Sequence, residues 1–347
     1  MLAGTYTSGE SEGIYVCKFN PANGKVVKFD SIKTSNPSYL SVSPDGKFVY
    51  AVNEDGKEDN GGTVTAFSFD KKSGKLKMLN SQLSGGDHPC FVEIDNSGRW
   101  VVVGNYSSGT FSVLPVKDDG SLGEKIHTIK HEGSGPDAKR QDKPHVHCTR
   151  FSSDNKWLFV ADLGIDKIMI YSFDSKNGRL TKSEQEFAAS DPGSGPRHIT
   201  FHPKEKYAYL IEEMSGTVVA FKYNEGRLER IQRVSLLPDG FSGRIGAADI
   251  HISPDGKFIY ASNRGDANDI SVFRIEENGE LRFSSRHSVM GKGPRNFTID
   301  PTGRFLLVAN QQSNEIVVFK INKEDGSLIP TDSSLPMDSP VFVYLVS

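Results

Sequence analysis

A hairpin-like stretch of seventeen residues recurs along the chain and constrains its fold more than any other feature. Each copy has two apolar runs on either side of a tight turn of Pro, Asp, Asn, Ser or Gly residues, which is typical of two antiparallel strands. A second hairpin follows each copy, so the repeating unit predicts a four-stranded sheet. The six copies begin at Pro37, Pro89, Val146, Pro196, Ala247 and Pro294.

The turns of the second hairpins outnumber those of the first, seven against six. Most of them combine a polar residue with a glycine, which suits positive φ. They are Asn23-Gly24, Ser73-Gly74, Asp119-Gly120, Asn177-Gly178, Glu225-Gly226, Asn278-Gly279 and Asp325-Gly326. The missing first hairpin falls at the chain ends, because residues 340–346 match its first strand and residues 2–6 match the end of its second.

The repeat starts, with Pro340 as the seventh, lie 46 to 57 residues apart, within the range of a four-stranded propeller blade. We therefore predict an all-β fold, one seven-bladed β-propeller domain over residues 1–347. The C-terminal strand pairs with the N-terminal strands in one shared blade, and this closure protects the sheet edges. The alternatives, an open β-sandwich or two smaller β-domains, would not predict seven outer turns against six inner ones.

The residue composition limits the classes of binding partner and of site that this chain can have. The 41 Lys and Arg residues nearly balance 44 Asp and Glu residues, so the net charge of −3 gives no reason to expect nucleic acid or an anionic membrane. The apolar stretches have the length of strands, so we expect no transmembrane helix. Cys17, Cys90 and Cys148 are odd in number and lie in apolar runs, which favours buried thiols over a disulfide framework or a metal site.

The N-terminus lacks a charged head followed by an apolar signal core, because strand-like sequence begins by Leu2. We expect a cytoplasmic protein, or an extracytoplasmic one if a signal sequence has been removed.

Two columns of the aligned repeats vary in residue type from copy to copy. The start of the first strand and the end of the second should pair at one edge of the hairpin, near the central channel, so the two columns should be neighbours. Such variation suits an asymmetric ligand. One residue after the repeat start come Ser38, Cys90, His147, Arg197, Ala248, Arg295 and Val341; seventeen residues after it come Glu54, Tyr106, Leu163, Glu213, Arg264 and Gln311, with Tyr6 in the shared blade.

The column just before the second of these is more uniform, which predicts a structural role in bonding the adjoining loops. Its members are Asn53, Asn105, Asp162, Glu212, Asn263 and Asn310. Three longer loops, residues 55–62, 131–143 and 237–246, also gather at this end of the channel and mark it as a functional face.

The variable columns carry groups suited to an anionic ester. Arg197, Arg264 and Arg295 could bind phosphate or carboxylate and stabilise an oxyanion formed when water attacks a carbonyl. His147 and Glu213 could supply the two proton transfers of ester or lactone hydrolysis, and the residues alone leave open which of them activates water.

Simpler interpretations exist for several of these residues. Arg197 and Arg264 could pair with Glu213 and Glu54 in a solvated channel. A metal could bind to His145 with His147 or to Asp249 with His251, but two ligands on one strand are a weak signal, so hydrogen bonds are favoured. No glycine-rich phosphate loop, nucleophile elbow or paired-cysteine pattern occurs, which leaves a nucleotide, serine-hydrolase or zinc function without support.

Three stretches carry a resemblance to a known family: Gly-Pro-Arg-His-Ile-Thr-Phe-His-Pro from Gly195, Ala-Ala-Asp-Ile-His-Ile-Ser-Pro-Asp-Gly from Ala247, and the Asn-Arg pair at Asn263. Over nearly its whole length the chain resembles the propeller-type lactonases, which include cycloisomerase-like 6-phosphogluconolactonases and carboxy-muconate lactonizing enzymes. The resemblance implies an active site of His147, Arg197, Glu213 and Arg264. Arg295 also matches a family position and would bind the substrate with Arg197, Arg264 and Tyr106.

The implied reaction is hydrolysis of 6-phospho-D-glucono-1,5-lactone to 6-phosphogluconate in the pentose phosphate route, with no cofactor and no metal. One alternative is a lactonase or lactonizing cycloisomerase for another carboxylated or sugar lactone. The other is a non-catalytic binding module, which would predict an apolar surface patch. The expected partner is a small anionic lactone, with neither nucleic acid nor a membrane, and the oligomeric state is left open.

Overall fold

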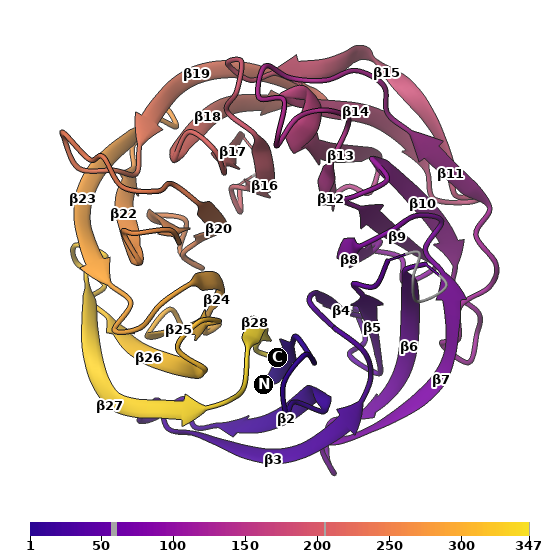
Figure 1. Ribbon diagram of the computed structural model, residues 1–347, viewed down its shortest axis with the longest axis horizontal. Coiled ribbons are helices and arrows are strands. Elements are labelled where there is room, and N and C mark those ends of the chain that lie inside the picture. The colour runs from indigo at the N-terminus through magenta and orange to yellow at the C-terminus, as the bar shows by residue number, and fades with distance from the viewer. Residues whose placement is uncertain (57–60, 205, 347) are drawn as a thin grey trace. The chain divides into compact units, whose positions relative to one another are not determined.

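The computed structural model describes residues 1–56, 61–204 and 206–346. Within these residues the strands form seven antiparallel sheets of four strands each (Figure 1). Residues 57–60 of the predicted 55–62 loop lie outside the described residues. The seven sheets have the size and number that the repeat predicted for the blades.

Three sheets are formed by residues 40–189. Their strands, in chain order, are β4 (Leu40–Val42), β5 (Phe48–Asn53), β6 (Thr63–Asp70) and β7 (Lys75–Leu83); β8 (Pro89–Ile94), β9 (Trp100–Asn105), β10 (Thr110–Pro115) and β11 (His127–Lys130); and β12 (Val146–Phe151), β13 (Trp157–Asp162), β14 (Lys167–Asp174) and β15 (Arg179–Ala189). Each run of four consecutive strands is one sheet.

Three more sheets are formed by residues 196–336. Their strands are β16 (Pro196–Phe201), β17 (Tyr207–Glu212), β18 (Thr217–Asn224) and β19 (Arg227–Ser235); β20 (Ala247–Ile252), β21 (Phe258–Asn263), β22 (Asp269–Ile275) and β23 (Leu281–Ser288); and β24 (Pro294–Ile299), β25 (Phe305–Asn310), β26 (Glu315–Ile321) and β27 (Leu328–Pro336).

The remaining sheet joins the two ends of the chain. β28 (Pro340–Tyr344) lies beside β1 (Leu2–Thr5), followed by β2 (Gly13–Phe19) and β3 (Val26–Lys33). β28 and β1 are antiparallel, with Ala3 opposite Val343, and Figure 1 shows both termini in this sheet. The predicted pairing of the C-terminal strand with the N-terminal strand is therefore confirmed.

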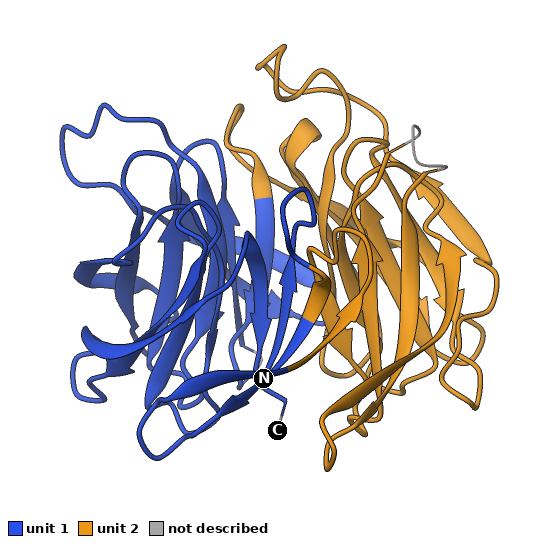
Figure 2. Cartoon of the chain, turned by 60° about the horizontal axis from the view of Figure 1, so that its bottom comes forward, with its two compact units in different colours: residues 1–11, 15–29, 197–347 blue, residues 12–14, 30–196 orange. Residues whose placement is uncertain are grey.

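By its internal contacts the chain divides into two compact units, which Figure 2 colours separately. Unit 1 contains residues 1–11, 15–29 and 197–347, and unit 2 contains residues 12–14 and 30–196. A single domain over residues 1–347 stays a prediction.

The glycines of the seven predicted outer turns all have positive φ, between 67° and 84°. Several also lie too close to an aromatic ring to carry a side chain. A Cβ on Gly326 would lie 2.6 Å from the Phe258 ring, and one on Gly178 would lie 2.6 Å from the Trp100 ring. Glycine is required at these turns by backbone conformation and by packing together.

The apolar core lies between neighbouring sheets. One cluster combines Phe258 and Tyr260 of β21 with Phe297 of β24 and Phe319 of β26, all at most 2% exposed. Burial of such side chains contributes roughly 2 kcal/mol each. The Tyr260 hydroxyl donates a hydrogen bond of 2.9 Å to the Gly326 carbonyl. This core residue therefore also stabilises the outer turn at Asp325-Gly326.

Cys17, Cys90 and Cys148 are buried thiols, as predicted. Burial raises the pKa of the Cys17 thiol to about 11. In the described part of the chain, no helix has the length and apolar character needed to cross a membrane.

Asp269, at the start of β22, is a buried carboxylate with an elevated pKa. Burial raises its pKa from 3.8 to about 6, although Arg286, whose Nε lies 3.4 Å from Asp269 Oδ2, opposes the rise. Because the folded-state pKa lies above the unfolded value, ionised Asp269 destabilises the fold above pH 6, and the penalty disappears as the pH falls toward 4.

We therefore expect Asp269→Asn to raise the free energy of unfolding at pH 7.5 by on the order of 1–2 kcal/mol. The gain over wild type should shrink to a small fraction near pH 4, where Asp269 is protonated in the folded state and roughly half protonated in the unfolded state. Urea unfolding of both proteins from pH 4 to 8 measures the difference. The exposed Asp239→Asn variant serves as the control and should show no such pH-dependent gain. A gain independent of pH would contradict this explanation.

Candidate active site

A β-bulge at the start of the inner strand aims the first variable column. In β12, Val146 is opposite Asp162 and Cys148 is opposite Ala161, so His147 is an extra residue in the ladder. In β24, Arg295 is the extra residue in the same way. Because a bulge bends its strand and re-aims the side chains there, these residues need not follow the inward and outward alternation of a regular strand.

In unit 1, Arg197, Glu213 and Arg264 form one ion-pair cluster. Arg197 Nε lies 2.9 Å from Glu213 Oε2, and Arg264 Nη2 lies 2.9 Å from the same oxygen. Their side chains are 2%, 10% and 18% exposed for Arg197, Glu213 and Arg264. Both arginines thus pair with Glu213, whereas the simpler interpretation divided them between Glu213 and Glu54, and the pairs are largely buried rather than in a solvated channel.

Backbone carbonyls also accept hydrogen bonds from the guanidinium groups of Arg197 and Arg264. Arg197 Nη1 donates to the Ala248 carbonyl at 2.5 Å, and Arg264 Nε donates to the Gly246 carbonyl at 3.1 Å. These acceptors lie where the 237–246 loop enters β20. The predicted loop therefore contributes directly to the placement of Arg264, whereas the carbonyl that holds Arg197 belongs to β20.

Arg295 belongs to the same electrostatic group. Burial, together with the charges of Arg197 and Arg295, lowers the pKa of Arg264 to about 10 against the opposing effect of Glu213. The guanidinium carbon of Arg295 lies 5.4 Å from the centre of the Tyr6 ring. Arg264 therefore lies within the electrostatic reach of two further arginines and of Glu213.

In unit 2, the Tyr106 ring contacts His147, the other predicted site residue. It lies edge-on to His147, with ring centres 5.6 Å apart, and stacks on His145 at 4.5 Å. Arg140, from the 131–143 loop, donates from Nη2 to the Tyr106 hydroxyl at 3.4 Å. His147 is buried, with the Tyr106 ring beside it.

The uniform column bonds loops, as predicted. The Asp162 carboxylate accepts hydrogen bonds from the backbone N–H groups of His145 and Gly164. Asn310 donates to the Val289 carbonyl, and Asn263 accepts from the Gly246 N–H. These side chains hold the loops next to the variable columns in place.

The two considered metal pairs make hydrogen bonds instead. His145 Nδ1 lies 3.0 Å from the Tyr106 carbonyl oxygen, and His251 Nε2 lies 2.9 Å from Asp249 Oδ2. Among the described residues, no group of three or more His, Cys, Asp and Glu side chains is arranged to hold a metal ion.

A third column, two residues after the repeat start, was not among the predicted site positions. In unit 1 it places His198, Asp249 and Asn296 in one buried polar chain behind Arg197. In unit 2 the corresponding residues are Tyr39, Phe91 and Cys148. The signal was this change from apolar residues to a run of three polar ones in consecutive repeats.

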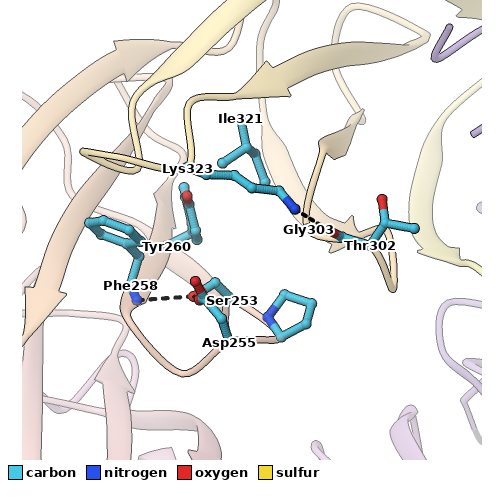
Figure 3. Close-up of a pocket in the computed structure, with 9 residues that line it drawn as sticks. Ser253, Asp255, Phe258, Tyr260, Thr302, Gly303, Ile321 and Lys323 are labelled. Carbon is cyan, nitrogen blue, oxygen red and sulfur yellow. Dashed lines mark hydrogen bonds between the residues drawn. The ribbon is translucent and has the colours of Figure 1, made fainter. Parts of the chain in front are cut away.

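A cavity of about 250 Å³ lies at the opposite end of the same strands (Figure 3). Ser253 and Asp255, in the β20–β21 turn, line it with Tyr260 and Lys323. Lys323 Nζ donates to the Thr302 carbonyl at 2.9 Å. The cavity is separate from the variable columns, and none of the predicted site residues lines it.

The match to a family model decides the classification. The model, described as a lactonase with a seven-bladed β-propeller, matches residues 1–345. The chain belongs to this family. The predicted fold class and the predicted family are therefore confirmed.

Several named relatives are similar to the chain over nearly their whole length. It is 40% identical to a 6-phosphogluconolactonase of Bacillus subtilis, over 98% of this chain and 96% of the relative. It is 39% identical to a 6-phosphogluconolactonase of Formosa agariphila, with 94% of each covered.

Two solved structures extend the comparison. A putative 6-phosphogluconolactonase from Bacteroides fragilis matches with a TM-score of 0.93 and 42% identity, covering 98% of this chain and 95% of that one. A periplasmic gluconolactonase from Pseudomonas aeruginosa matches with a TM-score of 0.96 and 39% identity, covering 100% and 98%. The relatives share the activity class of a lactone hydrolase.

Proposed function

We propose that this protein hydrolyses 6-phospho-D-glucono-1,5-lactone to 6-phosphogluconate. The names of its relatives support the reaction class, and the excess of positive charge around Glu213 supports an anionic substrate. Arg197 and Arg264 share one oxygen of Glu213, and the charge of Arg295 acts on Arg264. This concentration of guanidinium groups favours binding of an anion, and it is the observation that carries the proposal.

In the proposed reaction, water adds to the lactone carbonyl carbon and the bond from that carbon to the ring oxygen breaks. Arg197 and Arg264 stabilise the negative charge that develops on the carbonyl oxygen, while Arg295 and Tyr106 contribute to binding of the substrate. The departing ring oxygen takes up one proton, and the new carboxylic acid ionises. The step needs no oxidant or reductant.

We assign activation of the water to His147. Glu213 Oε2 already accepts from two guanidinium groups, so its clearest task is to hold Arg197 and Arg264 at a fixed separation. His147 occupies the bulge position of β12 that Arg295 occupies in β24, which brings it into the same column of the repeat. A histidine is the commonest general base near neutral pH.

The test is the rate of lactone opening with substrate generated in situ, corrected for spontaneous hydrolysis. We expect the wild-type protein to accelerate the reaction clearly and to show a higher kcat/KM for the phosphorylated lactone than for glucono-1,5-lactone. The control is Lys323→Ala, in the remote cavity, which should retain full activity. A wild-type rate equal to that of buffer would overturn the proposal.

A sugar lactone without phosphate is the second candidate substrate, because one similar solved structure is named a periplasmic gluconolactonase. Equal or higher kcat/KM for glucono-1,5-lactone in the same assay would favour it. A phosphorylated substrate would agree with the predicted cytoplasmic location, and fractionation of the native cells tests that location directly.

A further inference from the structure

Behind Arg197 lies a buried polar chain that the proposed reaction does not use. His198 Nδ1 lies 2.8 Å from Asp249 Oδ1, and the two side chains are 6% and 3% exposed. Asn296 Nδ2 donates to Asp249 Oδ2 at 2.5 Å, and Asn296 Oδ1 accepts from the Val343 N–H at 2.7 Å. The chain therefore crosses from β16 through β20 and β24 to β28.

Asp249 is surrounded by donors. Besides His198 and Asn296, its carboxylate meets His251 Nε2 at 2.9 Å and the backbone N–H groups of Ile250 and Phe297. Burial alone would raise the pKa of Asp249, but His251 and His198 hold it well below its ordinary value. Because an ionised carboxylate only accepts, His198 must carry a proton on Nδ1.

The guanidinium group of Arg197 also contacts the His198 ring. Its Nη1 lies 3.2 Å from His198 Nε2 and 3.5 Å from His198 Nδ1. An atom almost equally distant from both ring nitrogens lies against the face of the imidazole, since a position in the ring plane at these distances would collide with the carbon between them. A cation over an aromatic face is attracted to it.

Asp249 thus orients the ring, and the ring supports the guanidinium. We infer that His198 and Asp249 are positioning residues that hold Arg197 in the orientation needed to bind the lactone anion. Glu213 fixes Nε of Arg197 from one side, the Ala248 carbonyl fixes Nη1, and the His198 ring limits its remaining rotation. This inference rests on the proposed role of Arg197 in lactone hydrolysis.

The first test is a double-mutant cycle on kcat/KM. His198→Asn keeps a donor that can reach Asp249 but removes the ring face. We expect it to lower kcat/KM about 10-fold in the wild-type background and less than 2-fold in an Arg197→Ala background, because the arginine it supports is then absent. Equal losses in the two backgrounds, or no loss in the wild-type background, would overturn the inference.

Unit 2 offers a matched control in His131. Its Nδ1 lies 2.7 Å from Asp162 Oδ2, and both side chains are buried, but the ring's Nε2 bonds to the Tyr171 hydroxyl instead of facing an arginine. His131→Asn should lower the melting temperature about as much as His198→Asn while kcat/KM stays within 2-fold of wild type. A large loss of activity in this control would mean that generic loosening explains both variants.

A second readout does not depend on catalysis. The Nε–H of Arg197 donates to Glu213 at 2.9 Å in a buried setting, so its nuclear magnetic resonance signal should be resolved, and it can be assigned by its absence from Arg197→Lys. We expect the signal to shift or broaden in His198→Asn and to stay unchanged in His131→Asn. An unchanged signal in His198→Asn would overturn the inference even if the protein had a different substrate, whereas wild-type inactivity would count against the proposed function alone.

Discussion

Replacement of His147 by alanine is expected to lower kcat for 6-phosphogluconolactone hydrolysis by roughly 10²- to 10⁴-fold, the usual contribution of a general base. The expected change in KM is small, because the arginines that bind the anion remain. Glu213→Gln should cost less in kcat, about 10-fold, and should raise KM, because it loosens Arg197 and Arg264 without removing the base. Steady-state kinetics on the three proteins measure both effects.

The matched control for His147→Ala is His202→Ala. His202 is also a buried histidine, but it lies in the turn after β16 and bonds to the Gly256 carbonyl at 3.0 Å. Its loss should reduce stability and leave kcat within about 2-fold of wild type. If Glu213→Gln removed more of kcat than His147→Ala did, Glu213 would be the base and the assignment would be reversed.

Deletion of residues 340–347 is expected to abolish the stable folded monomer. It removes β28, whose Val341, Phe342 and Val343 are at most 3% exposed, and it leaves the edge of β1 unpaired. The three side chains alone account for roughly 5–8 kcal/mol of burial, comparable to the total stability of a typical domain, about 5–15 kcal/mol. Circular dichroism and size-exclusion chromatography of the truncated chain measure the outcome.

Two substitutions on β28 separate the loss of packing from the loss of residues. Val343 is 2% exposed, and its neighbour Tyr344, the last residue of the strand, is 40% exposed. Val343→Asp should destabilise the protein by about 4 kcal/mol or more, since it buries an unpaired charge. Tyr344→Asp should cost about 1 kcal/mol or less. A folded, cooperative truncated chain would show that the closure contributes little to stability.

Much of the fold could be predicted because its units are local. A hairpin is specified by a few adjacent residues. Polar-glycine turns such as Asn23-Gly24 and Asp325-Gly326 therefore predicted all seven outer hairpins, and their glycines have the expected positive φ. The register of the repeats also brought Arg197, Glu213 and Arg264 into neighbouring columns. The contacts among these three residues agree with that prediction, while their catalytic roles stay a proposal.

Other features of the site depend on neighbours that are distant in sequence. The bulge that leaves His147 and Arg295 outside the regular ladder depends on a register shift between two paired strands. The use of one Glu213 oxygen by two arginines depends on how β16, β17 and β21 with their following loops pack together. No pattern within a single repeat carries this information.

The sequence by itself determined the number of blades, their turns, the shared blade of the two chain ends and the positions of the charged columns, because each follows from residue type at a repeated spacing. Only the tertiary structure decided the partners within those columns. In the sequence, His198 is simply one more residue of an inner strand. In the structure, its Nδ1 lies 2.8 Å from Oδ1 of Asp249, which is 51 positions away and in the neighbouring sheet. Side-chain pairing is a property of distances between sheets, and those distances are set by packing after the blades have formed.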